Sequence, residues 1–323
     1  SAQEAAALPI SGVAWTAMKA EADKSVGTPD LSAQDEVENI RTLARALVWL
    51  RSGTTSYKDR VAATLGKVPE TENGGRTLSL GRKLGAYVIA ADIINYRPAV
   101  FVDWLNRVRF ETLDGSTLVK KHETKSNNWS QSCGFSRIIA DIYLGDNADL
   151  TKAINVFKGT LGDRAAFTFP ADAFGDDLSW QPDPSHPLVV LGTGAMIDGI
   201  IMGGALPEEL RRAGSFKWPP PCENYVWSAM EGIVGTAWVV SRLPNQPAWD
   251  WSDKAVLRAF TWQHQQAHCT ATGNDQHQPW VVNAIYGSNF PVVSPAQPGK
   301  LFGWGDWWAK PGVIPPPIPP AFK

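Results

Sequence analysis

AQDEVENIRTLARALVWLRS, residues 33–52, decides the fold class of this chain. Charged residues alternate there with apolar side chains that recur at steps of three and four residues. Those apolar positions are Val37, Ile40, Leu43, Leu47 and Leu50. This spacing is the period of an amphipathic α-helix with one face in a core. The stretch therefore predicts a helix packed against other elements.

The same periodicity extends outward along most of the chain, whereas alternating strand patterns are scarce. It predicts further helices over 56–66, 78–96, 98–112, 128–143, 147–158, 223–243 and 252–268. Consecutive helices joined by short links tend to be antiparallel neighbours. We therefore expect an all-α fold, an incomplete α/α toroid of antiparallel helical hairpins.

Two regions interrupt the helical rhythm, namely 162–192 and the part from about residue 270 onward. The first is rich in Pro, Asp and aromatic residues, and long loops on a rigid scaffold often carry function. We expect one domain over 1–308 with long functional loops. A Pro-rich tail over 309–323, ending in PGVIPPPIPPAFK, is expected to follow it.

Composition restricts the possible partners. The 323 residues have a formal net charge of −2, with Lys and Arg scattered, so no basic face for nucleic acid is predicted. No run of 18 apolar residues exists, which argues against a membrane partner. The N-terminal SAQEAAALP has no signal-peptide features, as would also hold if a signal peptide had been removed.

Metal and cofactor motifs are weak. Cys133, Cys222 and Cys269 lack metal-binding spacing and allow either one disulfide or three buried thiols. His264 and His268 have i, i+4 spacing without the rest of a HExxH motif, and GTGAM at 192–196 does not match GxGxxG. We expect no metal and no cofactor.

The segment SNNWSQSCGF, residues 126–135, opens a predicted buried helix with polar residues. Burying amide and hydroxyl groups costs free energy unless each finds a partner. Asn128 has two interpretations. It caps the helix, or its uncharged amide holds a carboxyl group.

A second segment, 198–240, places Arg211, Arg212 and Lys217 shortly before Tyr225. Cations beside a phenol favour its phenolate, which can then exchange protons near neutral pH. The alternative is a Tyr at a helix start beside hydrated Arg side chains. Two acidic residues after Pro207, Glu208 and Glu209, are expected to form a solvated first turn.

The chain has 15 Trp but only 6 Tyr. Indole rings fill cores and also offer flat faces for sugar rings and cations. Most are expected in the core, Trp227 among them. Trp129 and Trp180 are expected to line a cleft.

NNW followed by a helix, and the later DG…LPEELRRA…ENYVWSAMEGIVGTAWVV, resemble the alginate lyase superfamily of α/α-toroid polysaccharide lyases. The resemblance extends over residues 35–308, and these two segments are its specific part. It implies β-elimination on a uronic-acid polysaccharide of the alginate, polymannuronate or glucuronan kind. The implied partner is an anionic polysaccharide, so a secreted or periplasmic location is expected.

Carried over to this sequence, the resemblance gives Asn128 the role of neutralising the uronate carboxylate. Tyr225 matches the catalytic tyrosine, and Arg212 a nearby cation. Trp129 stands where the family has a histidine, so another His is expected to replace it, or Tyr225 performs both proton transfers. His186 in WQPDPSHP is the first candidate, and His122 is the next. The expected substrate contacts are Asn127, Trp129, Trp180, Arg211, Lys217 and His122, and either Arg211 or Lys217 could also be the catalytic cation.

Two other classes of protein stay open. A glycoside hydrolase on the same kind of fold needs two carboxylates flanking the scissile bond. Its candidates are Asp176, Asp177, Asp183, Asp198, Glu223 and Glu231. A non-catalytic glycan-binding protein is the third class.

Overall fold

A computed structural model of the chain describes residues 2–309, so nearly all of the expected Pro-rich tail lies outside the described residues. The expected all-α class is confirmed, because helices dominate that part of the chain. The α-helices are α1 (Ala2–Ala7), α2 (Val13–Asp23), α3 (Glu38–Ser52), α4 (Thr55–Leu65), α5 (Thr77–Ile94), α6 (Ala99–Val108), α7 (Leu118–Thr124), α8 (Asn128–Leu144), α9 (Asn147–Thr160), α10 (Pro207–Leu210), α11 (Asn224–Val240), α12 (Trp251–Gln265), α13 (Gln278–Tyr286) and α14 (Gly305–Trp308).

Short elements complete the secondary structure. The 3-10 helices are η1 (Ala171–Ala173), η2 (Arg211–Ala213) and η3 (Gly273–Asp275). Strands β1 (Met196–Ile197) and β2 (Ile200–Ile201) form a small antiparallel hairpin in which Met196 is paired with Ile201. This hairpin leaves the helical architecture unchanged.

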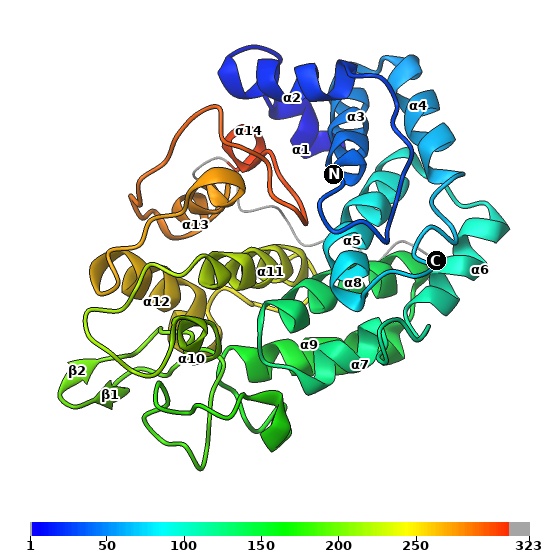
Figure 1. Cartoon of the computed structure of the whole chain (residues 1–323). Helices are drawn as coiled ribbons and strands as arrows, with labels where there is room; N and C mark the ends of the chain where they lie inside the picture. The colour runs from blue at the N-terminus through cyan, green and yellow to red at the C-terminus, as the bar shows by residue number, and fades with distance from the viewer. Residues whose placement is uncertain (1, 310–323) are drawn as a thin grey trace.

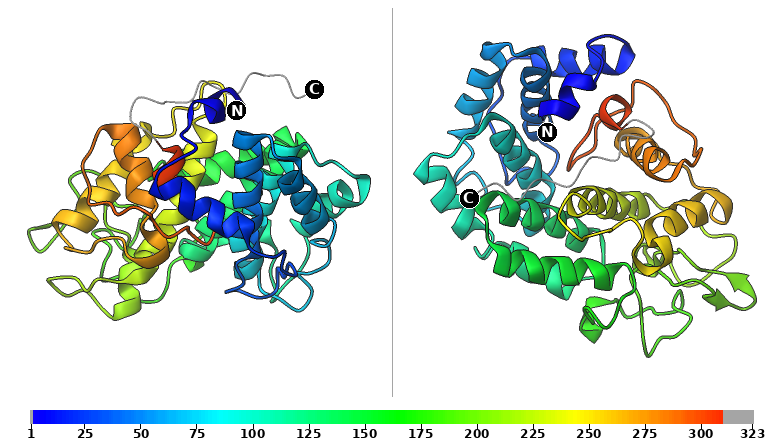
Figure 2. Two further views of the ribbon diagram at one scale, coloured as in Figure 1. Left: turned by 90° about the horizontal axis from the view of Figure 1, so that it is seen from above. Right: turned by 180° about the vertical axis from the view of Figure 1, so that it is seen from behind.

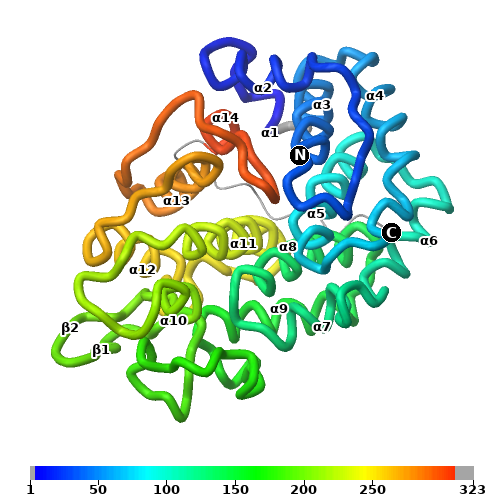
Figure 3. The backbone as a smooth tube through the Cα atoms, in the orientation of Figure 1, coloured from blue at the N-terminus to red at the C-terminus, as the bar shows by residue number. Residues whose placement is uncertain are grey.

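The helices pack in a series that follows the chain. Helix α3 contacts α5, α5 contacts α8, α8 contacts α11, and α11 contacts α13. Helices α4, α7 and α9 pack against members of this series. Figures 1 and 3 show the backbone passing around the molecule in this order, and both views in Figure 2 place the red α14 beside the blue α2.

A direct contact joins the two ends of the series. The indole N–H of Trp307 donates to the carbonyl of Pro9 at 2.9 Å, and its ring lies 5.6 Å from that of Trp15. The region before α3 and the region around α14 therefore pack together.

Helices α5 and α8 approach closely because glycines face the contact. A Cβ on Gly85 would lie 2.7 Å from the Phe135 ring, so only glycine fits there without a shift. The Ser136 hydroxyl donates to the Gly81 carbonyl at 2.7 Å. This packing buries the polar first turns of α8 beside α5.

Tryptophan burial supports the expectation that most indoles belong to the core. Trp104, Trp180, Trp227, Trp262, Trp304 and Trp307 are all buried, with 2% exposure or less. Trp227 is thus a core residue, as expected. Trp180 is also a core residue, so the expectation that it lines a cleft is wrong.

The irregular region 162–192 has its own small apolar core. Val156 of α9 packs there with Phe169, Ala173, Phe174 and Val189. A disulfide links Cys222, just before α11, to Cys269, just after α12, and Cys133 is a buried free thiol. One bridge, not three thiols, is the arrangement found.

No helix in the described residues is long and apolar enough to cross a membrane.

Candidate functional site

The N-terminus of α8 separates the roles of its two asparagines. Asn127 is the N-cap, since its side-chain oxygen accepts a hydrogen bond from the Trp129 N–H at 3.1 Å. The backbone N–H of Asn128 instead donates to the Glu209 carboxylate. The capping interpretation thus applies to Asn127, which leaves the Asn128 side chain for another role.

The Asn128 amide is enclosed but unsatisfied. The residue is 1% exposed, and neither its side-chain oxygen nor its nitrogen has a hydrogen-bond partner in the described part of the chain. An unpaired buried polar group costs about 1–3 kcal/mol. Such a group points to a water or ligand partner.

Glu208 and Glu209 are buried, so the expectation of a solvated first turn is wrong. Glu208 accepts hydrogen bonds from the Arg211 Nε at 2.6 Å and from the Gly175 N–H at 3.0 Å. Glu209 lies against Asn128, and burial raises the pKa of its carboxyl group to about 8. The segment packs inward because its carboxylates bond groups from elsewhere in the chain.

Tyr225 lies beside Arg212, as the sequence suggested. The Arg212 guanidinium carbon stands 4.8 Å from the centre of the Tyr225 ring, and Tyr225 is 43% exposed in the first turn of α11. The charge of Arg212 also acts on Glu209 and opposes the rise in its pKa. Asn128 thus contacts Glu209, and Arg212 contacts Tyr225, while the charge of Arg212 acts on Glu209.

The two other predicted cations lie differently. Arg211 is bound to Glu208, and the Lys217 ammonium is exposed, with the Ala213 carbonyl 3.4 Å away. Trp129 is partly buried, and the Lys121 ammonium lies 5.1 Å from its ring centre. Of the three cations, Arg212 is the one stacked on Tyr225.

His186 is exposed on the 162–192 region and has a carboxylate partner. Its Nδ1 lies 2.8 Å from Asp183 Oδ2. Hydrogen bonds from Ser185 and then from His186 lower the pKa of Asp183 to about 2. A carboxylate fixes the orientation of such a ring and supports its use as a base. Among the described residues, no direct contact joins His186 to the Asn128 group.

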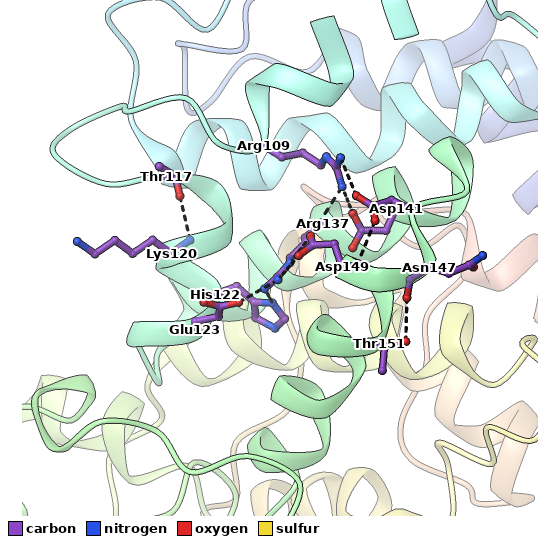
Figure 4. Close-up of polar contacts among 11 residues, drawn as sticks. Arg109, Thr117, Lys120, His122, Glu123, Arg137, Asp141, Asn147, Asp149 and Thr151 are labelled. Atoms are coloured by element: carbon purple, nitrogen blue, oxygen red, sulfur yellow. Dashed lines mark hydrogen bonds and ion pairs between the residues drawn. The ribbon is translucent and has the colours of Figure 1, made fainter. Parts of the chain in front are cut away.

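His122 belongs to a buried polar network rather than to a surface that substrate could reach. Figure 4 shows its ring directed toward Arg137, with Nη1 and Nδ1 3.4 Å apart. Arg137 donates in turn to Asp149, through Nε at 2.9 Å. Burial and then the Arg137 charge hold the pKa of His122 well below its usual value. The expected substrate contact by His122 is therefore wrong.

A second polar group lies in the interior between α5, α8, α11 and α13, and the sequence analysis did not single it out as a site. We call it the interior cluster. Its members are Arg82, Gln131, Glu231, Asp275, His277 and Gln278, each at most 6% exposed.

Direct contacts join two pairs of residues in the interior cluster. His277 Nε2 lies 3.4 Å from Glu231 Oε1, and the Gln278 amide donates to Asp275 at 2.9 Å. Burial and then the Glu231 charge raise the pKa of Asp275 to about 8. Gln131 packs on Gly232, the residue after Glu231 in α11.

One sequence signal could have pointed to the cluster. Gln131 follows Asn128 by three residues, so both amides lie on the same face of α8. The other members come from distant segments, which only the folded chain brings together.

No group of three or more His, Cys, Asp or Glu side chains in residues 2–309 is placed to hold a metal ion. The His264 Nδ1 lies 2.8 Å from the Phe260 carbonyl within its own helix.

The search against protein-family models found no match for this chain, and the search of curated proteins likewise found no match. The class of protein therefore has to be argued from the site.

Proposed function

We propose that this protein is a polysaccharide lyase that cleaves a uronic-acid-containing polysaccharide by β-elimination, on an incomplete α/α toroid. The series α3, α5, α8, α11 and α13, with further helices packed against it, supports that architecture. The observation that carries the function is the buried, unsatisfied Asn128 amide. It lies against Glu209, and the charge of Arg212, which stacks on Tyr225, acts on Glu209.

β-Elimination removes the proton on the carbon next to the sugar carboxylate and expels the glycosidic oxygen one carbon further on. Negative charge then builds up on the carboxylate in the transition state. A neutral amide donor aimed at that group stabilises the charge, and one good donor contributes about 3–4 kcal/mol. Asn128 supplies such a donor once the side chains that enclose it move apart.

Tyr225 is the proton-transfer residue of this proposal. Arg212 lies against its ring, with the guanidinium carbon 4.8 Å from the ring centre. The exposed phenol can take the proton of the sugar carbon and return one to the leaving oxygen. His186, oriented by Asp183, is the alternative base, and each proton-transfer role is typically worth about 10²–10⁴-fold in rate.

The disulfide supports the proposed extracytoplasmic location. Disulfides persist in secreted and periplasmic proteins and are rare in reducing compartments. The Cys222–Cys269 bridge therefore fits an enzyme that meets its polymer outside the cytoplasm.

Glycoside hydrolysis is a second candidate, favoured by the carboxyl groups of the interior cluster. Burial and then the Glu231 charge raise the pKa of Asp275 to about 8, which favours its protonated form. One protonated and one ionised carboxyl group are the acid and base that hydrolysis requires. Asp275→Asn would then abolish cleavage.

The test is ultraviolet absorbance during incubation with polymannuronate, polyguluronate, glucuronan, hyaluronan and chondroitin. A lyase produces a conjugated alkene, so absorbance rises with each cleavage. A hydrolase produces new reducing ends without that signal. Absence of both with every polymer would refute the proposed lyase activity.

Matched variants assign the residues on any polymer that is cleaved. Tyr225→Phe should lose nearly all turnover, whereas Tyr96→Phe, outside the site, should not. Asn128→Ala removes the proposed donor, and Asn127→Ala removes only a helix cap worth about 1 kcal/mol. Equal losses of activity in the two Asn variants would contradict the role of Asn128.

A further inference from the structure

Arg82 is a buried cation on α5 with an unused hydrogen-bond donor. The residue is 6% exposed, and its Nη1 has no partner in the part of the chain that the structure describes. Burial lowers the pKa of its guanidinium, and the charges of Glu231, Asp35, Asp275 and Tyr225 oppose that effect. The charges of two members of the interior cluster, Glu231 and Asp275, thus act on Arg82.

The neighbouring helix α8 carries two further unused donors. Gln131 Nε2 and Asn128 Nδ2, on one face of α8, also lack partners within residues 2–309. Helix α5 contacts α8 directly, and Gly81, next to Arg82 in the chain, packs on Cys133, two residues after Gln131. Three unused donors, one of them charged, match an anionic ligand rich in hydrogen-bond acceptors.

We propose that Arg82 is the cation that binds the carboxylate of the substrate sugar, with Gln131 as a second donor. This inference rests on the proposed lyase function and names the residue that determines its specificity for a charged sugar. A guanidinium suits this task, because its planar fork matches both oxygens of a carboxylate.

The other three cations are committed elsewhere or lie further out. Glu208 holds Arg211, Arg212 stacks on Tyr225, and Lys217 is exposed. Arg212 therefore acts on the phenol, and Arg82 acts on the sugar carboxylate. The two tasks, proton transfer and charge recognition, fall to different arginines.

The segment Gly299–Leu301 packs directly on Glu231 and His277 of the interior cluster. The Leu301 N–H donates to Glu231 at 3.0 Å, and Asn39 donates to the Lys300 carbonyl at 2.9 Å. A Cβ on Gly299 would stand 1.8 Å from Glu231 Oε1, so the backbone itself covers the cluster.

Arg82 is the most exposed member of the interior cluster, at 6%, and Gln131 is 2% exposed. A sugar carboxylate that enters from solvent would therefore meet Arg82 before Gln131.

The experiment compares each acidic ligand with its uncharged methyl ester. Isothermal calorimetry on the Tyr225→Phe protein measures binding of mannuronate, guluronate and glucuronate trimers, and of their methyl esters, which lack the charge. We expect the acid to bind at least about tenfold more tightly than its ester. Arg82→Met should remove this preference, and Arg212→Met should keep it.

Arg76→Met is the matched control, because Arg76 is an exposed cation at the N-cap of the same helix. It should leave the preference unchanged. An Arg82→Met protein that still prefers the acid overturns the assignment of Arg82. A preference for the acid that disappears with Arg212→Met but not with Arg82→Met also overturns this assignment.

Arg82→Lys provides a second test in case Arg82→Met does not fold, as judged by circular dichroism. Lysine keeps the charge but loses the fork, so the acid should bind several-fold more weakly and the ester as before. Unchanged acid affinity overturns the inference. If no trimer binds and the wild type cleaves no polyuronate, the lyase function fails, and the inference fails with it.

Discussion

The Cys222–Cys269 disulfide should supply a large part of the stability of the region that carries Tyr225. It closes a loop across a sequence separation of 47 residues, which contains all of α11 and α12. Loop-closure entropy for that length corresponds to about 4 kcal/mol at 25 °C. Cys222 is exposed, so a reductant can reach the bridge.

Urea unfolding followed by tryptophan fluorescence, with and without a thiol-free reductant, measures this contribution. We expect reduction to lower the free energy of unfolding by about 4 kcal/mol. The double variant Cys222→Ser with Cys269→Ser should be equally destabilised and should no longer respond to reductant. A loss below about 1 kcal/mol in both experiments would refute the loop-closure reasoning.

The same bridge should affect catalysis if the proposed function holds. Cys222 lies three residues before Tyr225, so breaking the bridge loosens the first turn of α11. Turnover should then fall at temperatures where the reduced protein is still folded. Unchanged turnover in the folded reduced protein would show that Tyr225 is held by α11 alone.

Three further predictions concern single side chains. Because burial raises the pKa of Glu209 from 4.5 to about 8, the folded state holds this proton more tightly than the unfolded chain. The free energy of unfolding of the wild type should therefore fall relative to that of Glu209→Gln as pH rises from about 4.5 to about 8. A constant difference between the two proteins across that range, measured by urea unfolding, would contradict the assignment. Gly134→Ala should destabilise the protein by about 1–3 kcal/mol, because the new Cβ would lie 2.5 Å from His122 Nε2. A thermal unfolding midpoint equal to that of the wild type would contradict this prediction. His186→Gln should lower kcat by about 10²–10⁴-fold if the Asp183–His186 pair is the base, whereas unchanged kcat would assign both proton transfers to Tyr225.

The sequence was sufficient for the helices because their periodicity is local. Residues 33–52 contain α3, and the expected 147–158 and 252–268 correspond to α9 and α12 within a few residues. Short helices such as α7 were missed, since two turns carry too little periodicity to recognise. The N-terminal helices α1 and α2 were not predicted either.

Burial was harder to predict than secondary structure. Glu209 comes two residues after a proline at the start of a turn, a position typical of solvated carboxylates. In the structure it is buried and accepts a hydrogen bond from the Asn128 N–H. Trp180 stands in a loop rich in polar residues, but its indole N–H donates to the Gly214 carbonyl inside the core. Both outcomes depend on contacts between residues distant in sequence, which local patterns do not encode.

The polar residues of α8 show how the folded chain separates structural from functional side chains. The Ser130 hydroxyl donates to the His122 carbonyl at 2.9 Å, and Ser136 donates to Gly81 of α5. These two hydroxyls are satisfied within the fold, so they explain how a helix with polar residues can be buried.

Asn128 and Gln131 lie on the same helix and are equally buried, yet each keeps a donor without a partner in residues 2–309. Apolar residues at these two positions would have avoided that loss of about 1–3 kcal/mol for each group. Stability alone therefore does not account for these amides, whereas the proposed recognition of an acceptor-rich anion by Asn128, Gln131 and Arg82 gives each of them a role.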